Sequence, residues 1–108
     1  MAPKRRDVML RYAQALIHYR SFEKAYQLLK KARNYPPQYP RLQKLFAQAA
    51  GETGRLAESH QALAEYYYLQ GDTASALQQL RIAKNRAGKN KYLLARIEAR
   101  KKEIELKQ

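Results

Sequence analysis

The sequence predicts an all-α protein in which about six helices form antiparallel pairs stacked as an α-solenoid. Residues that end or interrupt helices recur every 17 positions, at Pro37, Gly54, Gly71 and Gly88. Each interval leaves room for a helix of about 12–14 residues and a short turn. Apolar residues recur at the same interval, at Tyr12, Leu29, Phe46, Leu63, Leu80 and Ile97. Helix-favouring residues such as Ala, Leu, Gln and Lys are abundant, and β-branched residues are scarce.

Length and composition are those of one domain, residues 1–108, with residues 1–6 and 103–108 expected to be frayed. The absence of cysteine excludes a disulfide framework and a thiolate metal site. No apolar run approaches the roughly 20 residues of a membrane span. The chain opens with Met and a short basic segment and carries no signal-peptide pattern, which fits a cytosolic protein or a fragment of a longer one.

The first half of the chain predicts three helices. The first runs from about Asp7, a good N-cap, to Tyr19, and the second follows Ser21 and stops at Asn34 before two prolines. The third begins near Pro40 and ends between Gly51 and Gly54. The first helix is expected to bury one face, made by Met9, Tyr12, Ala13 and Leu16.

The second half predicts three more helices. One spans about Leu56 to Gln70 and is closed by Gly71, with Leu56, His60, Leu63, Ala64 and Tyr67 inward. Another opens at Asp72 or Thr73 and ends near Gly88, and the last begins after Asn90 as a cap. We expect Leu29, Phe46, Leu63 and Leu80 to be nearly fully buried, with Ala25, Ala76 and Ala83 at close helix contacts.

The net charge of +13 is unevenly distributed. No Lys or Arg occurs between residues 56 and 80, whereas Glu58, Glu65 and Asp72 do, so an acidic centre lies between basic ends. The charges form no compact run, which favours a solvated helix surface over a dedicated polyanion site. Binding of nucleic acid or another polyanion is the alternative function.

Two segments resemble tetratricopeptide repeats, whose period is 34 residues. Residues 9–32 and 60–83 each carry the small and apolar residues of that pattern, and they begin 51 positions apart. That separation is one and a half periods, so the frame shifts by one helix between the segments. The third helix is therefore the irregular element.

A narrower resemblance covers residues 49–100, which include the runs HQALAEYYYLQGD, ALQQL and RIEAR. These residues resemble the C-terminal repeat domain of bacterial M48-family zinc metalloproteases of the β-barrel assembly-enhancing type. The resemblance implies a periplasmic docking module that follows a signal peptide and a zinc protease domain, and that engages outer-membrane assembly partners. It implies zinc only in that protease domain and no cofactor in this segment.

No catalytic constellation occurs in the sequence. Zinc proteases of this type need His-Glu-x-x-His, but His18 and His60 lie 42 residues apart and neither precedes Glu. The segment is therefore predicted to be no enzyme and to bind no small-molecule substrate.

A concave surface for protein partners is the expected functional feature. The resemblance to tetratricopeptide repeats places Gln14, Ile17 and His18 of the first helix and Gln61, Glu65 and Tyr68 of the fourth on it. Exposed tyrosines make good contact residues. Glu65 would repel a terminal carboxylate, so clamping of a partner's C-terminus is not expected.

Overall fold

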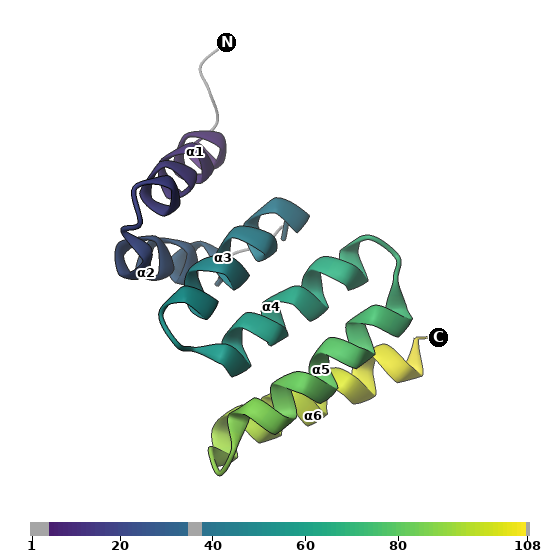
Figure 1. Ribbon diagram of the computed structural model, residues 1–108. Coiled ribbons are helices and arrows are strands. Elements are labelled where there is room, and N and C mark those ends of the chain that lie inside the picture. Colours follow the sequence, from purple (N-terminus) through teal and green to yellow (C-terminus); the bar gives the residue numbers. More distant parts are fainter. Residues whose placement is uncertain (1–4, 35–37, 108) are drawn as a thin grey trace.

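The computed structural model describes residues 5–34 and 38–107 and shows an all-α fold with no strand in these residues. Six helices follow one another in the order α1 (Arg5–His18), α2 (Phe22–Arg33), α3 (Pro40–Glu52), α4 (Leu56–Leu69), α5 (Thr73–Ala87) and α6 (Lys91–Leu106) (Figure 1). The all-α prediction is confirmed. Three of the four residues of the predicted Asn34–Pro37 break, 35–37, lie outside the described residues.

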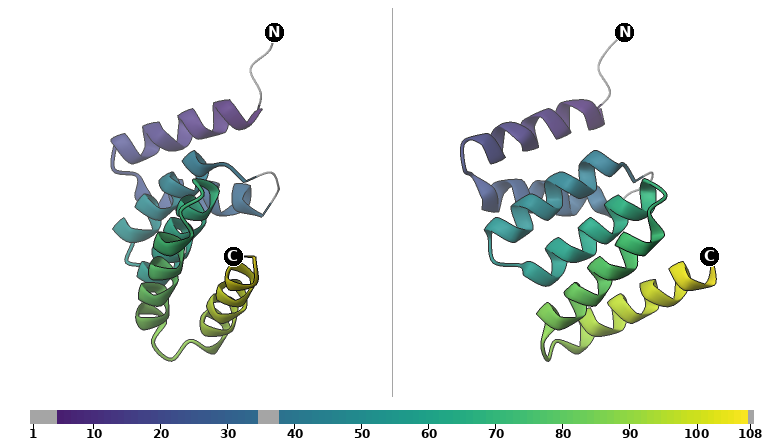
Figure 2. Two further views of the ribbon diagram at one scale, coloured as in Figure 1. Left: turned by 90° about the vertical axis from the view of Figure 1, so that its right-hand side faces the viewer. Right: turned by 45° about the vertical axis from the view of Figure 1, so that its right-hand side comes forward.

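Consecutive helices pack against each other, and α4 lies at the centre, between α3 and α5 (Figures 1 and 2). The radius of gyration is 14.0 Å and the principal extents are 40 × 30 × 19 Å. A compact domain of this length would have a radius of about 13 Å. The molecule is therefore a short, slightly elongated stack.

One turn geometry recurs at Gly54 and Gly71, two positions of the 17-residue interval. In α4 the Gly71 N–H donates to the Tyr68 carbonyl at 3.0 Å and the Asp72 N–H donates to the Tyr67 carbonyl at 2.9 Å, which is the Schellman arrangement. The same pair of bonds closes α1 and α3. The residue in the left-handed conformation is Gly71 in α4, Gly54 in α3 and Arg20 in α1, with φ of 83°, 81° and 62°.

Side chains cap two helices at the expected places. The Asp72 carboxylate accepts from the Ser75 N–H at 3.0 Å, and the Asn90 side chain accepts from the Leu93 N–H at 3.1 Å. Ser21 precedes α2 as expected but forms no side-chain cap bond. Asp7 is not an N-cap, since α1 begins at Arg5 and Asp7 lies in its first turn, where a carboxylate favours the helix dipole.

The C-terminal helix extends further than expected. Residues 103–106, which were predicted to be frayed, are helical, and Arg5 and Arg6 are likewise part of α1. The reason at the C-terminus is that Ile104 is fully buried against α5 and its neighbours. Burial of this side chain anchors the last turns of α6.

Two hydrophobic clusters form the core, one among α1, α2, α3 and Ala62, the other among α4, α5 and α6. Leu29, Phe46 and Leu80 are at most 2% exposed, and the three small residues predicted at helix contacts, Ala25, Ala76 and Ala83, are completely buried. The prediction for Leu63 is wrong, because this side chain is only partly buried. Helix α4 instead buries Ala57 and Ala62, together with Ala64, for which the inward prediction is confirmed.

The predicted inward faces of α1 and α4 also need correction. Tyr12 is 57% exposed, whereas Ala13 is completely buried as predicted, and α1 buries Leu10 and Ile17 beside it. The helix lies at the end of the stack and contacts the rest along one narrow face, so the neighbouring stripe of its surface is the one that is covered (Figure 1). In α4, Leu56 is 39% exposed.

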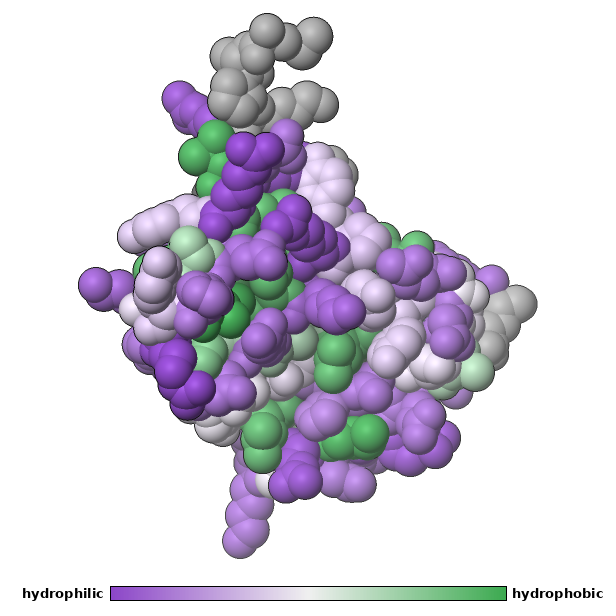
Figure 3. All heavy atoms as spheres, turned by 45° about the horizontal axis from the view of Figure 1, so that its top comes forward, coloured by the Kyte–Doolittle hydropathy of each residue, from purple (hydrophilic) through white to green (hydrophobic). Residues whose placement is uncertain are grey.

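Hydrophilic side chains cover most of the face displayed in Figure 3, with hydrophobic residues in small separate groups. Among the described residues, no helix combines the length and apolar character needed to cross a membrane.

The turn geometry predicts a conformational cost for replacing Gly71 by alanine. An added Cβ would meet no atom within 4 Å, so steric crowding is absent and only the positive φ opposes the substitution. We expect Gly71→Ala to lower the free energy of unfolding by about 1 kcal/mol, as measured by urea denaturation. The matched variant Gln70→Ala, at a residue with φ of −85°, should change it by less than about 0.5 kcal/mol. Equal stabilities of the two variants would contradict the turn assignment.

The close packing of α5 predicts different effects at two alanines of that helix. Ala76 is completely buried, whereas Ala74 is exposed. Ala76→Leu should destabilise the protein by about 1–3 kcal/mol because the added methyl groups overpack the interface. Ala74→Leu should be nearly neutral. Thermal melts monitored by circular dichroism check this difference, and a parent-like melting temperature for Ala76→Leu would refute the close contact.

Candidate functional site

A cavity of about 650 Å³ opens between α2, α4 and α6, and we call it the central cavity. Figure 2 shows α6 lying apart from α4, on the side toward which α2 ends. Helices α2, α4 and α6 supply most of its wall, and Phe46 of α3 and Leu80 of α5 lie at its apolar floor. Its lining consists of Lys30, Arg33, Asn34, Gln38, Gln43, Phe46, Glu58, Gln61, Glu65, Leu80, Asn90, Tyr92, Leu93, Arg96, Ala99, Arg100 and Glu103.

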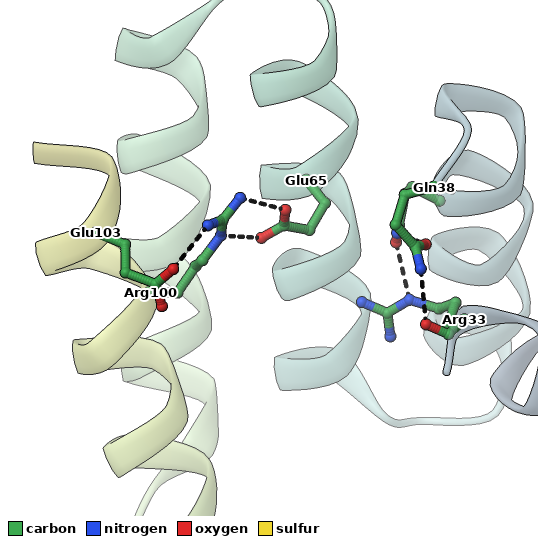
Figure 4. A network of polar contacts seen from close by, with 6 residues as sticks. Arg33, Gln38, Glu65, Arg100 and Glu103 are labelled. Atoms are coloured by element: carbon green, nitrogen blue, oxygen red, sulfur yellow. Dashed lines mark hydrogen bonds and ion pairs between the residues drawn. The ribbon is translucent and has the colours of Figure 1, made fainter. Parts of the chain in front are cut away.

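Arg33, the last residue of α2, is held in place by neighbouring side chains. Its Nε donates to the Gln43 side-chain oxygen at 2.8 Å, and its guanidinium lies 4.2 Å from the centre of the Phe46 ring. Gln43, which is 2% exposed, donates in turn to Gln38 at 2.7 Å, and Gln38 donates to the Arg33 carbonyl at 2.8 Å (Figure 4). This closed network fixes the plane of the guanidinium.

The charge of Arg33 is poorly compensated. Burial lowers the pKa of its guanidinium; the carboxylate of Glu65 and, less strongly, that of Glu58 oppose this shift, while repulsion from Arg96 of α6 adds to it. Arg33 forms no ion pair with any residue in the described ranges. Figure 4 shows the Nη end of the Arg33 guanidinium directed toward α4, the helix that carries Glu65.

The opposite wall is a polar clamp between α4 and α6. Arg100 donates to both carboxylate oxygens of Glu65, at 2.8 and 2.9 Å, and to Glu103 at 3.2 Å (Figure 4). Its guanidinium also lies 4.9 Å from the centre of the Tyr68 ring. The hydrogen bonds to Glu65 raise the pKa of Arg100. The bidentate geometry is the strongest form of this ion pair, and it joins residues 35 positions apart.

A second polar connection joins α2 to the start of α4. The Tyr26 hydroxyl donates to Glu58 at 2.6 Å, and the Arg55 guanidinium lies 3.8 Å from the centre of the Tyr26 ring. Arg55 also forms a bidentate ion pair with Glu23, at 2.7 and 2.8 Å. Burial, and secondly the bond to Glu58, raises the pKa of Tyr26 to about 12.

The six residues predicted to share one concave wall do not lie together, which corrects the expected geometry. Gln61 and Glu65 line the central cavity, and Tyr68 contacts it through Arg100. The three residues of α1 lie elsewhere: Gln14 accepts a hydrogen bond from Arg41 of α3, Ile17 is only 8% exposed, and His18 packs edge-on against Tyr19. The predicted repeat frame makes α1 one of the helices of the concave wall, whereas α2, α4 and α6 supply most of the wall of the central cavity.

The arginines of the cavity are not among the residues that the sequence predicts for the site. Arg96 and Arg100 are four residues apart on α6 and so share one face, with Glu103 one turn further on. The spacing of Arg96 and Arg100 indicates a charged helix face, but the end of the chain is predicted to be a frayed charged tail. For Arg33 the sequence offers no signal, because its environment comes from Gln43 and Phe46 of the next helix.

The described residues contain no group of three or more His, Cys, Asp or Glu side chains that could hold a metal ion. His60 is hydrogen-bonded to Gln79 at 2.7 Å. Comparisons of the chain with known protein families, with curated proteins and with solved structures find no match.

The Tyr26–Glu58 hydrogen bond predicts a pH dependence of stability. The pKa of Tyr26 is higher in the folded protein than its ordinary value of 10.0, so this contribution is complete below pH 10 and is lost between about pH 10 and 12. Tyr26→Phe should destabilise the protein at pH 7 by about 1.5 kcal/mol. Urea denaturation of both proteins should show that this difference shrinks as the pH rises from 9 to 12. A difference that stays constant would contradict the assignment.

Proposed function

We propose that this protein is a docking module that binds an extended segment of a partner protein in the central cavity. The observation that carries the proposal is the cavity itself, whose walls come from the successive even-numbered helices of the stack. Stacked helix pairs commonly use such a concave surface for protein partners. Small-molecule sites are mostly lined by apolar residues, whereas charged and amide side chains form most of this lining.

The tyrosine and arginine side chains near the cavity suit protein recognition. Tyr92 at its rim is 69% exposed, and Arg96 lies over its ring at 5.7 Å from the centre. Tyrosine and arginine are enriched among the residues that dominate binding at protein interfaces. Both groups are available to a partner segment that crosses α6.

A narrower proposal rests only on the resemblance of residues 49–100 to the repeat domain of M48-family metalloproteases. In that case the module would act in the periplasm and bring a linked zinc protease to outer-membrane assembly partners. Catalysis and zinc would belong to the linked domain. Direct binding between the purified chain and purified outer-membrane assembly proteins, measured by biolayer interferometry, tests this narrower proposal, and absence of binding would contradict it.

A matched pair of substitutions on α6 tests docking in the cavity. Ala99 and Ala95 are both exposed on this helix, but only Ala99 lines the cavity. Peptides are first selected from a displayed library of random 12-residue sequences on the immobilised protein. Fluorescence anisotropy should then show that Ala99→Trp weakens binding of a selected peptide at least about tenfold, since the indole would occupy part of the space that the peptide needs. Ala95→Trp should change the affinity by less than about twofold.

Two outcomes would overturn the docking proposal. One is a selection that enriches no peptide, and the other is equal affinity of the two tryptophan variants for the selected peptides. Binding of a labelled DNA duplex at 150 mM salt that neither tryptophan substitution alters, without any peptide binding, would favour the polyanion alternative suggested by the net charge of +13.

A further inference from the structure

Three cationic side chains of the central cavity have no ion-pair partner within the described residues. These are Lys30 and Arg33 of α2 and Arg96 of α6. The other cation of the cavity, Arg100, is fully engaged with Glu65 and Glu103. Unpaired cations of two different helices therefore face one hollow.

None of the cavity's carboxylates forms an ion pair with these three cations. Glu65 and Glu103 are bound by Arg100, and Glu58 accepts a hydrogen bond from the Tyr26 hydroxyl. Four cations against three carboxylates leave the lining with a formal surplus of positive charge. Glu58 and Glu65 would repel an incoming anion, so an anion gains most beside α2, near Arg33.

Arg33 is the side chain best prepared for an anion. Gln43 holds its Nε and Phe46 supports one face of the guanidinium, while the two Nη groups have no hydrogen-bond partner among the described residues. The guanidinium fork matches the two oxygens of a carboxylate. Because the group is already partly dehydrated and its plane is fixed, little further ordering is needed on binding.

We propose that the central cavity takes an extended acidic segment of a partner protein, and that the Nη groups of Arg33 bind a side-chain carboxylate of that segment. The inference rests on the proposed docking function and specifies its ligand. Side-chain carboxylates fit better than a single chain terminus, since Lys30, Arg33 and Arg96 lie on two helices and together call for more than one acidic group. Apolar residues between the acidic ones would contact Leu93, which is only partly buried in the cavity wall.

The probe is a fluorescein-labelled, amidated peptide in which Glu-Gly-Leu is repeated four times, with a second peptide that has Gln in place of Glu. Arg33→Gln is compared with Arg86→Gln, which removes the same charge from an exposed residue of α5 outside the cavity. Fluorescence anisotropy at 50 mM salt should show at least tenfold tighter binding of the Glu peptide than of the Gln peptide. Arg33→Gln should weaken binding of the Glu peptide about tenfold, and Arg86→Gln less than twofold.

Arg33→Lys keeps the charge and tests the fork, and we expect it to weaken binding about threefold or more. The inference is overturned if Arg33→Gln and Arg86→Gln behave alike, or if both peptides bind equally. It is also overturned if the Gln peptide with a free C-terminus binds as tightly as the amidated Glu peptide, since a chain terminus would then suffice. If library-selected peptides still bind and remain sensitive to Ala99→Trp, the docking function stands while this inference fails. If no selected peptide binds, both fail.

Discussion

The structure depends on the close approach of α4 to both of its neighbours. Alanines make this possible: Ala62 of α4 belongs to the first hydrophobic cluster and Ala64 to the second, and both are completely buried. On the facing helices, Ala50 and Ala76 are also completely buried. Small side chains let helix axes approach to about 8–10 Å, and the buried apolar area then holds α3, α4 and α5 together as one layer.

Helix α6 is attached to that layer in a different way, and the central cavity follows from the difference. Its buried apolar residues, Ile97 and Ile104, belong to the second hydrophobic cluster, and the helix packs against α5. Toward α4 it presents Arg100, whose long side chain reaches Glu65 and so spans a wider separation than two alanines would. An ion pair of this kind sets orientation more than it adds stability, because both groups must be partly dehydrated. The result is a polar wall beside an open space.

The periodic features of the chain could be predicted from the sequence, and the site could be predicted only in part. Helix ends at Gly54, Gly71 and Gly88 and the buried alanines of α5 follow from local rules, because conformational preference and helical spacing act within one element. Leu63 and Tyr12 were assigned to the core on the same interval, yet the actual packing exposes them in part. Of the expected groove residues, Gln61 and Glu65 do line the cavity. Gln14, Ile17 and His18 of α1 do not line it, because the choice of helices that surround the cavity depends on how the helices pair in space.

The sequence by itself determined the number of helices, their approximate limits and the turn chemistry, for each depends on residues close together in the chain. Only the tertiary structure decided which helices surround the cavity and which charges there lack partners. Arg33 and Arg96 are 63 positions apart in the sequence, and their mutual repulsion exists only because the fold places α2 and α6 around one hollow. Electrostatic interactions depend on distance in space and on burial, and neither is contained in a local sequence pattern.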